Sequence, residues 1–289
     1  MQQAILIQNI SIVNEGQITI NDLLIDNGLI QKIGYINTGI NTKVIDGTGK
    51  HLFPGIIDGQ VHFREPGLTH KGDLYTESKA AVAGGVTSFI DMPNTVPNVL
   101  TVEILDEKYK IASEKSLANF GFFLGVNSDN IDEVIKLDTS NLLGISDDGL
   151  YFTKKGNLLS DNPETMEKLF SKCKSIIAIH SEKEQIVEAN ENVYRTKYGE
   201  NVPIECHPLI RSEKACFDAT KGAIELANKH KARLHILHLT TEAETHLFRN
   251  DIPLKIKNIT AEVSFPDKSP FFNSIKYRNV MTHFFCNFF

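Results

Sequence analysis

The feature that most constrains this chain is a rhythm of short apolar runs separated by helix-like segments, which begins at residue 53 and continues to about residue 263. The strand candidates read FPGIIDGQVHF, VTSFIDM, NFGFFLGV, NLLGISDD, SIIAIHS, RLHILHL and NITAEVSF. Strands that alternate with helices are typical of a parallel sheet with its helices packed on the outside. Residues 53–263 are therefore predicted to form an α/β domain with seven parallel strands in an open or closed sheet.

The segment DNPETMEKLFSKC shows how one of the intervening helices is specified. Asn162 is a good N-cap, and Pro163 suits the first helical position because that position needs no backbone N–H donor. Apolar residues then follow at positions i, i+3, i+4 and i+7, namely Met166, Leu169, Phe170 and Cys173. This spacing places them on one face and predicts an amphipathic helix.

Residues 1–52 have a different pattern, with short alternating runs such as AILIQNISIV, GQITINDLLID and GLIQKIGYI. Turn residues separate the runs at strand spacing, among them Gly16, Asn27 and Gly28. This part is predicted to be a small β-domain in front of the α/β domain.

Composition excludes several classes of protein. The net charge is −6, so the sequence offers no basic surface for nucleic acid or for an anionic membrane. No apolar run approaches the roughly 20 residues of a transmembrane helix, and the N-terminus lacks the features of a signal peptide. The four cysteines are scattered and include no C-x-x-C pair, which indicates reduced thiols. A cytoplasmic protein with a small-molecule substrate is expected.

Polar residues recur near the carboxyl ends of the strand candidates. Gln60, His62 and Arg64 alternate, so on a strand they share one face. The others are Asn94, the pair Asp147 and Asp148, His180 and His238. In a β/α barrel this end carries the active site, and imidazoles with a carboxylate are good ligands for zinc. A single strand-end histidine is more often structural, so the metal hypothesis depends on their recurrence at one end of the sheet.

These segments resemble the dihydroorotases of the amidohydrolase superfamily. The similar stretches are VIDGTGKHLFPGIIDGQVHFREPGLTHKGD, AAVAGGVTSFIDMPNT, GISDDG, AIHSE, HPLIRSEKAC and LHILHLTT. The combination of HFREPG with MPNT is distinctive, because hydantoinases and allantoinases share the barrel but usually lack this pair. The resemblance implies a distorted (β/α)8 TIM-like barrel with a small β-domain. It also implies reversible cyclisation of N-carbamoyl-L-aspartate to (S)-dihydroorotate in de novo pyrimidine biosynthesis.

The resemblance also implies roles for single residues. His62, Asp148, His180 and His238 match metal ligands, Asp148 is also the candidate catalytic carboxylate, and Arg64 with Asn94 matches the pair that binds the substrate carboxylate. Gln60 stands where the family has the first histidine of the strand-one pair. One Zn2+ held mainly by Asp148, His180 and His238 is therefore an alternative to two ions, with Gln60 as a possible further ligand. Asp147 is interpreted as a turn-shaping neighbour and His235 as a packing residue.

The resemblance stops after NITAEV. Residues 264–289 contain seven of the 17 phenylalanines and show no strand or helix period, so they are predicted to be an aberrant tail, either frame-shifted, truncated or divergent. The strand-eight Asp of the family does not occur in this sequence. We therefore expect a barrel incomplete at its C-terminus and little turnover. A non-catalytic dihydroorotase-like structural partner and a hydantoinase/allantoinase-type cyclic amidase remain alternatives, and a homo-oligomer is possible.

Overall fold

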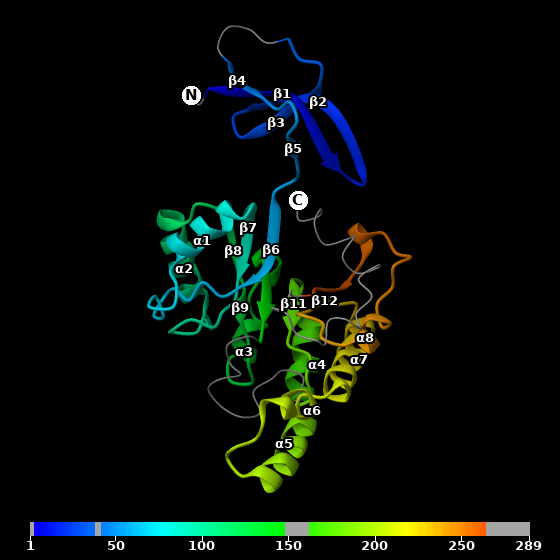
Figure 1. Cartoon of the computed structure of the whole chain (residues 1–289). Helices are drawn as coiled ribbons and strands as arrows, with labels where there is room; N and C mark the ends of the chain where they lie inside the picture. The colour runs from blue at the N-terminus through cyan, green and yellow to red at the C-terminus, as the bar shows by residue number, and fades with distance from the viewer. Residues whose placement is uncertain (1–2, 38–41, 148–161, 264–289) are drawn as a thin grey trace. The chain divides into compact units, whose positions relative to one another are not determined.

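The computed structural model of the chain describes residues 3–37, 42–147 and 162–263. The chain divides into two compact units, Met1–Gly55 and Ile56–Phe289 (Figure 1). Two of the sequence predictions, Asp148 and the Phe-rich tail of residues 264–289, lie outside the described ranges.

The first unit is a five-stranded sheet with the order β3-β2-β1-β4, in which β5 pairs with β1. Its strands are β1 (Ala4–Asn14), β2 (Gln17–Asp26), β3 (Leu29–Gly34), β4 (Thr42–Asp46) and β5 (His51–Leu52). The first three strands are antiparallel neighbours, whereas β4 and β5 run parallel to β1. The predicted N-terminal β-region is thus present.

Two-residue turns join the antiparallel strands of this unit. Glu15 and Gly16 have φ values of 48° and 74°, and Asn27 and Gly28 have φ values of 51° and 76°. Positive φ at both central residues is the geometry of the type I′ turn, whose twist matches that of the flanking strands. Asn and Gly adopt this conformation at little cost, so the Asn27–Gly28 dipeptide specifies its hairpin locally.

The second unit is built on parallel strands that pair in chain order. They are β6 (Ile56–Val61), β7 (Val86–Asp91), β8 (Asn119–Phe122), β9 (Leu124–Gly125), β10 (Gly144–Ser146), β11 (Ile176–Ile179), β12 (Arg233–Ile236) and β13 (Ile259–Ala261). One sheet contains β6-β7-β8 and the other contains β9-β10-β11-β12-β13. Only Phe123 separates β8 from β9, so the described residues provide seven successive parallel strand positions.

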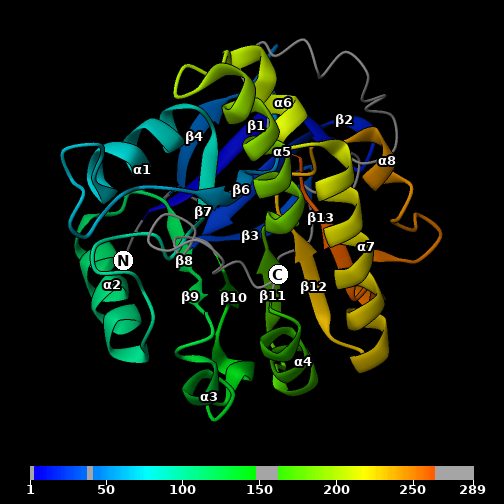
Figure 2. The same ribbon diagram turned by 90° about the horizontal axis from the view of Figure 1, so that it is seen from below.

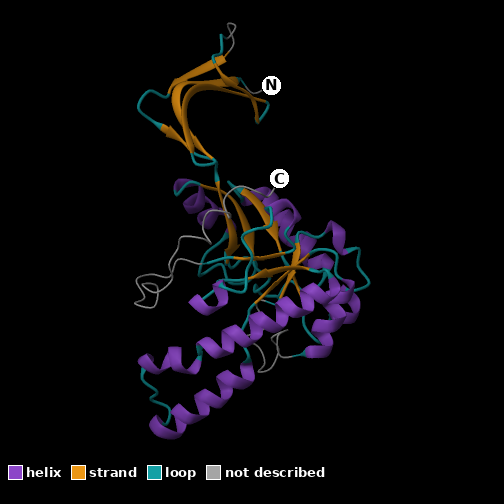
Figure 3. Cartoon of the chain, turned by 90° about the vertical axis from the view of Figure 1, so that its right-hand side faces the viewer, coloured by secondary structure: helices purple, strands orange, loops and turns teal. Residues whose placement is uncertain are grey.

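Helices lie around the outside of these strands (Figures 2 and 3). They are α1 (Leu74–Ala83), α2 (Val102–Lys115), α3 (Ile131–Val134), α4 (Pro163–Lys172), α5 (Glu184–Tyr198), α6 (His207–Ile210), α7 (Glu213–His230) and α8 (Glu242–Thr245), with short 3-10 turns at Thr139–Asn141, Ile204–Cys206 and Leu254–Ile256. The predicted fold class, an α/β barrel-type domain preceded by a β-region, is confirmed.

Helix α4 forms as its sequence predicts. Asn162 accepts a hydrogen bond from Thr165 N through Oδ1 at 3.0 Å, and Pro163 is the first helical residue. Leu169 and Phe170 are buried on the face that packs into the core.

Strand alternation separates two apolar layers. Phe89 and Ile177 belong to the large core between strands and helices, whereas their chain neighbours Ile90 and Ala178 belong to a smaller inner cluster with Phe123. Successive side chains of a strand point to opposite faces, so the inner cluster marks the interior side of the sheet. The described cysteines, Cys173, Cys206 and Cys216, are buried free thiols. Within the described ranges, no helix is both long and apolar enough to cross a membrane.

Candidate functional site at the strand ends

An irregularity in the pairing of β6 determines the sheet face on which His62 lies. Ile57 and Gly59 of β6 line the interior, whereas Val61 and Phe63 pack against the outer core. The pairing of β6 with β7 is irregular between Asp58 and Val61, and an extra residue at such a bulge moves the following side chains to the other face. This shift places His62 on the interior side, at the point where β6 ends.

The predicted alternation of Gln60, His62 and Arg64 along one strand face is wrong beyond Val61. Strand β6 ends at Val61, and Arg64 has a φ of 60°, in the left-handed region. Arg64 O then accepts a hydrogen bond from Leu68 N at 3.0 Å, so Arg64 opens a turn and does not continue the strand. Gln60 lies in β6 and is half-buried.

The ends of β6 and β7 meet through two polar side chains. His62 Nδ1 lies 3.0 Å from Asn94 Oδ1. An amide oxygen can only accept, so this contact places the proton of a neutral imidazole on Nδ1 and the lone pair on Nε2. Asn94 thereby orients His62 as well as being the predicted substrate-binding residue.

The segments that carry these residues also run side by side in their turns. Val96 N donates to Pro66 O at 3.2 Å, and Gly67 has a φ of 81°. A Cβ atom on Gly67 would lie 2.0 Å from Val96 O, so only glycine fits this position. The final Gly of HFREPG therefore permits the close approach of HFREPG to MPNT.

His180 is oriented by a buried carboxylate. Asp147 is fully buried, and its Oδ1 accepts from His180 N at 2.9 Å and lies 3.2 Å from His180 Nδ1. The carboxylate holds the Nδ1–H tautomer, which leaves Nε2 as the nitrogen with the lone pair. Asp147 was interpreted from sequence as a turn residue, and its role as the partner of His180 was missed. The signal was its position, one residue before Asp148 at the end of β10.

His238 lies against His180. The two ring centroids are 4.8 Å apart in an edge-to-face arrangement. His238 has a φ of 33°, in the left-handed region that residues other than glycine rarely adopt. Such strained conformations persist where the surroundings fix them and gather at functional sites. The structure therefore brings these two predicted metal ligands together from the ends of β11 and β12.

The paired imidazoles fit a divalent metal in chemistry, because nitrogen donors with a fixed tautomer are the usual ligands of zinc. Within the described ranges, however, no group of three or more His, Cys, Asp or Glu side chains is placed to hold an ion. The predicted carboxylate ligand, Asp148, lies outside those ranges. The complete ligand set stays a prediction.

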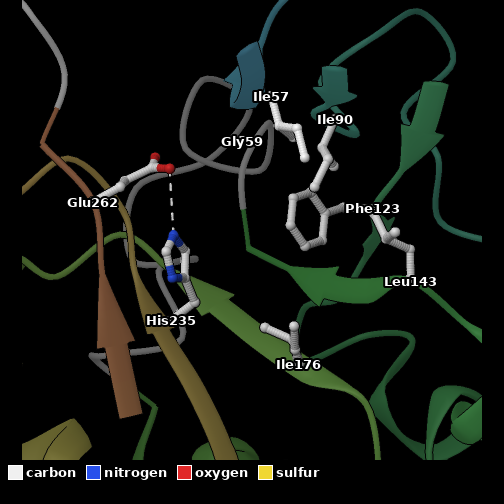
Figure 4. A pocket seen from close by; sticks show the side chains of 8 residues that line it. All are labelled: Ile57, Gly59, Ile90, Phe123, Leu143, Ile176, His235 and Glu262. Atoms are coloured by element: carbon white, nitrogen blue, oxygen red, sulfur yellow. Dashed lines mark hydrogen bonds and ion pairs between the residues drawn. The ribbon is translucent and has the colours of Figure 1, made fainter. Parts of the chain in front are cut away.

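A cavity inside the sheet has one polar wall, formed by His235 and Glu262 (Figure 4). His235 Nε2 lies 3.3 Å from Glu262 Oε2, and His235 Nδ1 lies 2.9 Å from Thr260 Oγ1. His235 was interpreted as a packing residue, but it is a hydrogen-bonded residue of the interior. Burial raises the pKa of the nearby Asp58 carboxyl, and the negative charge of Glu262 adds to the rise.

The fold and the strand-end histidines define a class: β/α barrels that carry their functional groups at the carboxyl ends of parallel strands. The match of an amidohydrolase family model to residues 51–258 identifies the branch of this class. The chain belongs to the amidohydrolase family.

Relatives within the family carry several activities. Over 235 residues the chain is 33% identical to a dihydroorotase of Methanosarcina acetivorans, covering 80% of this chain and 49% of the relative. It is 32% identical to a dihydroorotase of Lactococcus lactis, covering 84% and 56%, and 30% identical to an allantoinase of Deinococcus radiodurans, covering 71% and 46%. The chain thus spans about half the length of the curated relatives it matches.

Solved structures agree with the fold. The L-hydantoinase of Arthrobacter aurescens superposes with a TM-score of 0.77 at 22% identity, covering 91% of this chain and 58% of that one. At this identity the likeness supports the architecture alone.

Proposed function

We propose that this chain provides the substrate site of a cyclic amide hydrolase of the dihydroorotase type. The reaction is the reversible cyclisation of N-carbamoyl-L-aspartate to (S)-dihydroorotate. The observation that carries the proposal is the contact of His62 with Asn94, which joins the HFREPG and MPNT segments at the ends of β6 and β7. The similarity to dihydroorotases of two organisms supports it.

Arg64 and Asn94 would bind the substrate carboxylate. The guanidinium of Arg64 presents a planar fork of N–H donors that matches a carboxylate. Because Asn94 Oδ1 faces His62 Nδ1, the opposite side of the amide carries the Nδ2 donor that a carboxylate needs. One charged and one neutral donor would then fix the position of the substrate next to the histidines.

The metal proposed for this site is zinc. His180 and His238 would hold it together with Asp148 and His62, with Gln60 as a possible further ligand. Zinc would supply an activated water, with a pKa near 7, and polarise the amide carbonyl. Asp147 would fix the His180 tautomer that presents Nε2, and Asn94 would do the same for His62.

Binding measurements on the purified chain with added zinc test this proposal. Dihydroorotate and N-carbamoyl-L-aspartate carry a carboxylate, whereas hydantoin and allantoin do not. Isothermal titration should show that dihydroorotate and N-carbamoyl-L-aspartate bind. Hydantoin and allantoin should bind at least about tenfold more weakly. Equal affinity for neutral and carboxylate ligands would contradict the dihydroorotase assignment.

A second candidate function is ring opening of the hydantoinase or allantoinase type, which the similarity to the allantoinase of Deinococcus radiodurans supports. In that case allantoin or hydantoin would bind in preference to dihydroorotate. A chain that binds zinc and none of the four ligands would instead favour the non-catalytic structural role.

A further inference from the structure

A lysine is buried completely beneath the strand ends. Lys108 of α2 has no exposed surface, and its Nζ lies 2.9 Å from Asp91 Oδ2. The same ammonium donates a hydrogen bond to Met92 O at 3.0 Å and stands 4.8 Å from the centroid of the Phe122 ring. A carboxylate, a carbonyl and an aromatic face therefore surround one cation.

The Asp91 carboxylate connects the two segments that carry the candidate substrate residues. Its Oδ1 accepts from Phe63 N at 3.0 Å, and Phe63 directly follows His62. The same oxygen accepts from Met92 N at 3.0 Å, two residues before Asn94, and Met92 N also donates to Val61 O at 3.0 Å. Oδ2 faces Lys108. The ion pair thus fixes the orientation of the carboxylate that joins the backbones next to His62 and Asn94.

Stability is a weak reason for a buried ion pair in this position. Removing an ammonium and a carboxylate from water is costly, and apolar residues of the same size often replace such a pair without loss. The long lysine side chain also loses its rotamer freedom. An apolar pair would lack the carboxylate oxygen that accepts from two backbone amides. It would also lack the ammonium that donates to Met92 O.

We propose that Asp91 and Lys108 are positioning residues that hold His62 and Asn94 in register at the ends of β6 and β7. Neither residue contacts the substrate in this role. The inference rests on the proposed function, because it concerns the geometry of the same carboxylate-binding site. It extends the proposed function, because Lys108 of α2, a helix on the outside of the sheet, would then set the geometry of the site.

Four variants separate positioning from stability. Lys108→Met removes the cation and leaves Asp91 buried without its counter-charge. Combining it with Asp91→Leu makes the pair apolar, so that part of the lost stability returns. Lys110→Met is the matched surface control, since Lys110 is exposed on the same helix. Leu105→Ala is the matched core control, because Leu105 is buried on that helix and its apolar side chain cannot form a hydrogen bond.

The readouts are amide exchange at Phe63, affinity for N-carbamoyl-L-aspartate, and the urea midpoint of unfolding. Lys108→Met should speed exchange of the Phe63 amide and weaken binding, each by about tenfold or more. In the double variant position 91 offers no acceptor to the Phe63 amide, so exchange and binding should stay impaired although the urea midpoint rises above that of Lys108→Met. Lys110→Met should change none of the three.

Recovery of binding and amide protection together with the urea midpoint in the double variant would overturn the positioning role, as would equal effects of Leu105→Ala and Lys108→Met. If Lys108→Met does not fold, the double variant still decides. A wild-type chain that fails to bind N-carbamoyl-L-aspartate would count against the proposed function, and amide exchange would then decide the positioning role.

Discussion

Replacement of Asp147 by asparagine should weaken zinc binding while leaving the fold almost as stable as before. Asp147 is fully buried, and its Oδ1 accepts from both the backbone N and the ring Nδ1 of His180. An asparagine Oδ1 can still accept both bonds, so the substitution removes the negative charge and retains the contacts. Asp147 Oδ2 is buried and has no hydrogen-bond partner among the described residues, so replacing this oxygen by an amide nitrogen breaks no hydrogen bond.

The expected magnitudes follow from these contacts. Exchanging a charged acceptor for a neutral one at a retained bond changes stability by about 1 kcal/mol or less. The ring of His180, however, loses the negative charge beside Nδ1 that raises the basicity of Nε2, although an amide oxygen still selects the same tautomer. Loss of such a partner typically lowers metal affinity by about 10- to 100-fold, which corresponds to about 1.4–2.7 kcal/mol.

Competition with a chromogenic zinc chelator measures the affinity, and urea unfolding measures the stability. Asp138→Asn is the control, because the exposed Asp138 carboxylate also accepts a backbone N–H, from Ser140 at 3.3 Å, far along the chain from the histidines. Zinc affinity of Asp147→Asn equal to that of the unchanged chain would refute the role of Asp147. So would an equal loss in Asp138→Asn.

Three further predictions concern single residues. Arg64→Lys loses the planar fork and should weaken the binding of N-carbamoyl-L-aspartate about tenfold in a titration. Unchanged affinity would contradict the role of Arg64 in binding the carboxylate. Gly67→Ala must adopt a φ of 81° against Val96 O and should lower the free energy of unfolding by more than about 2 kcal/mol in urea. Burial raises the pKa of the Asp58 carboxyl above 3.8, so the folded state holds its proton to higher pH than the unfolded state does. Stability attributable to Asp58 therefore falls as pH rises through the folded pKa, and Asp58→Asn should remove that part of the pH dependence and stabilise the chain at pH 7, an outcome that parallel pH profiles would contradict.

Local sequence signals predicted those parts of the fold that depend on neighbouring residues. Helix α4 forms between its Asn162 cap and Cys173 because capping, proline placement and apolar spacing all agree there. The rhythm of strands and helices also predicted the parallel sheet. The side-chain directions at the end of β6 were not predictable in this way. Strict alternation holds only for a regular strand, and the irregular pairing after Asp58 depends on contacts with β7.

The contact of His180 with His238 was predictable from the sequence, because each histidine follows the end of one of two neighbouring strands. The groups that orient the histidines were less predictable. Asp147 and Asp148 are identical in type, and only the approach of His180 assigns Asp147 its partner. Lys108 carried a signal that was overlooked. It stands three residues after Leu105 and four before Ala112, on the buried stripe of α2, where a lysine requires a counter-charge.

The two-residue turns of the first unit have a consequence for the order in which the chain acquires structure. Hairpins closed by such turns form in about 1–10 μs, because their contacts are local in sequence. The parallel pairs of the second unit, such as Ile56 with Val86, must first close much longer loops. A ribosome adds about 5–20 residues per second, so the remainder of the chain up to β13 takes on the order of 10 s or longer to appear. We therefore expect the β1–β2 and β2–β3 hairpins to form on the nascent chain, while most of the parallel sheet is still unsynthesised.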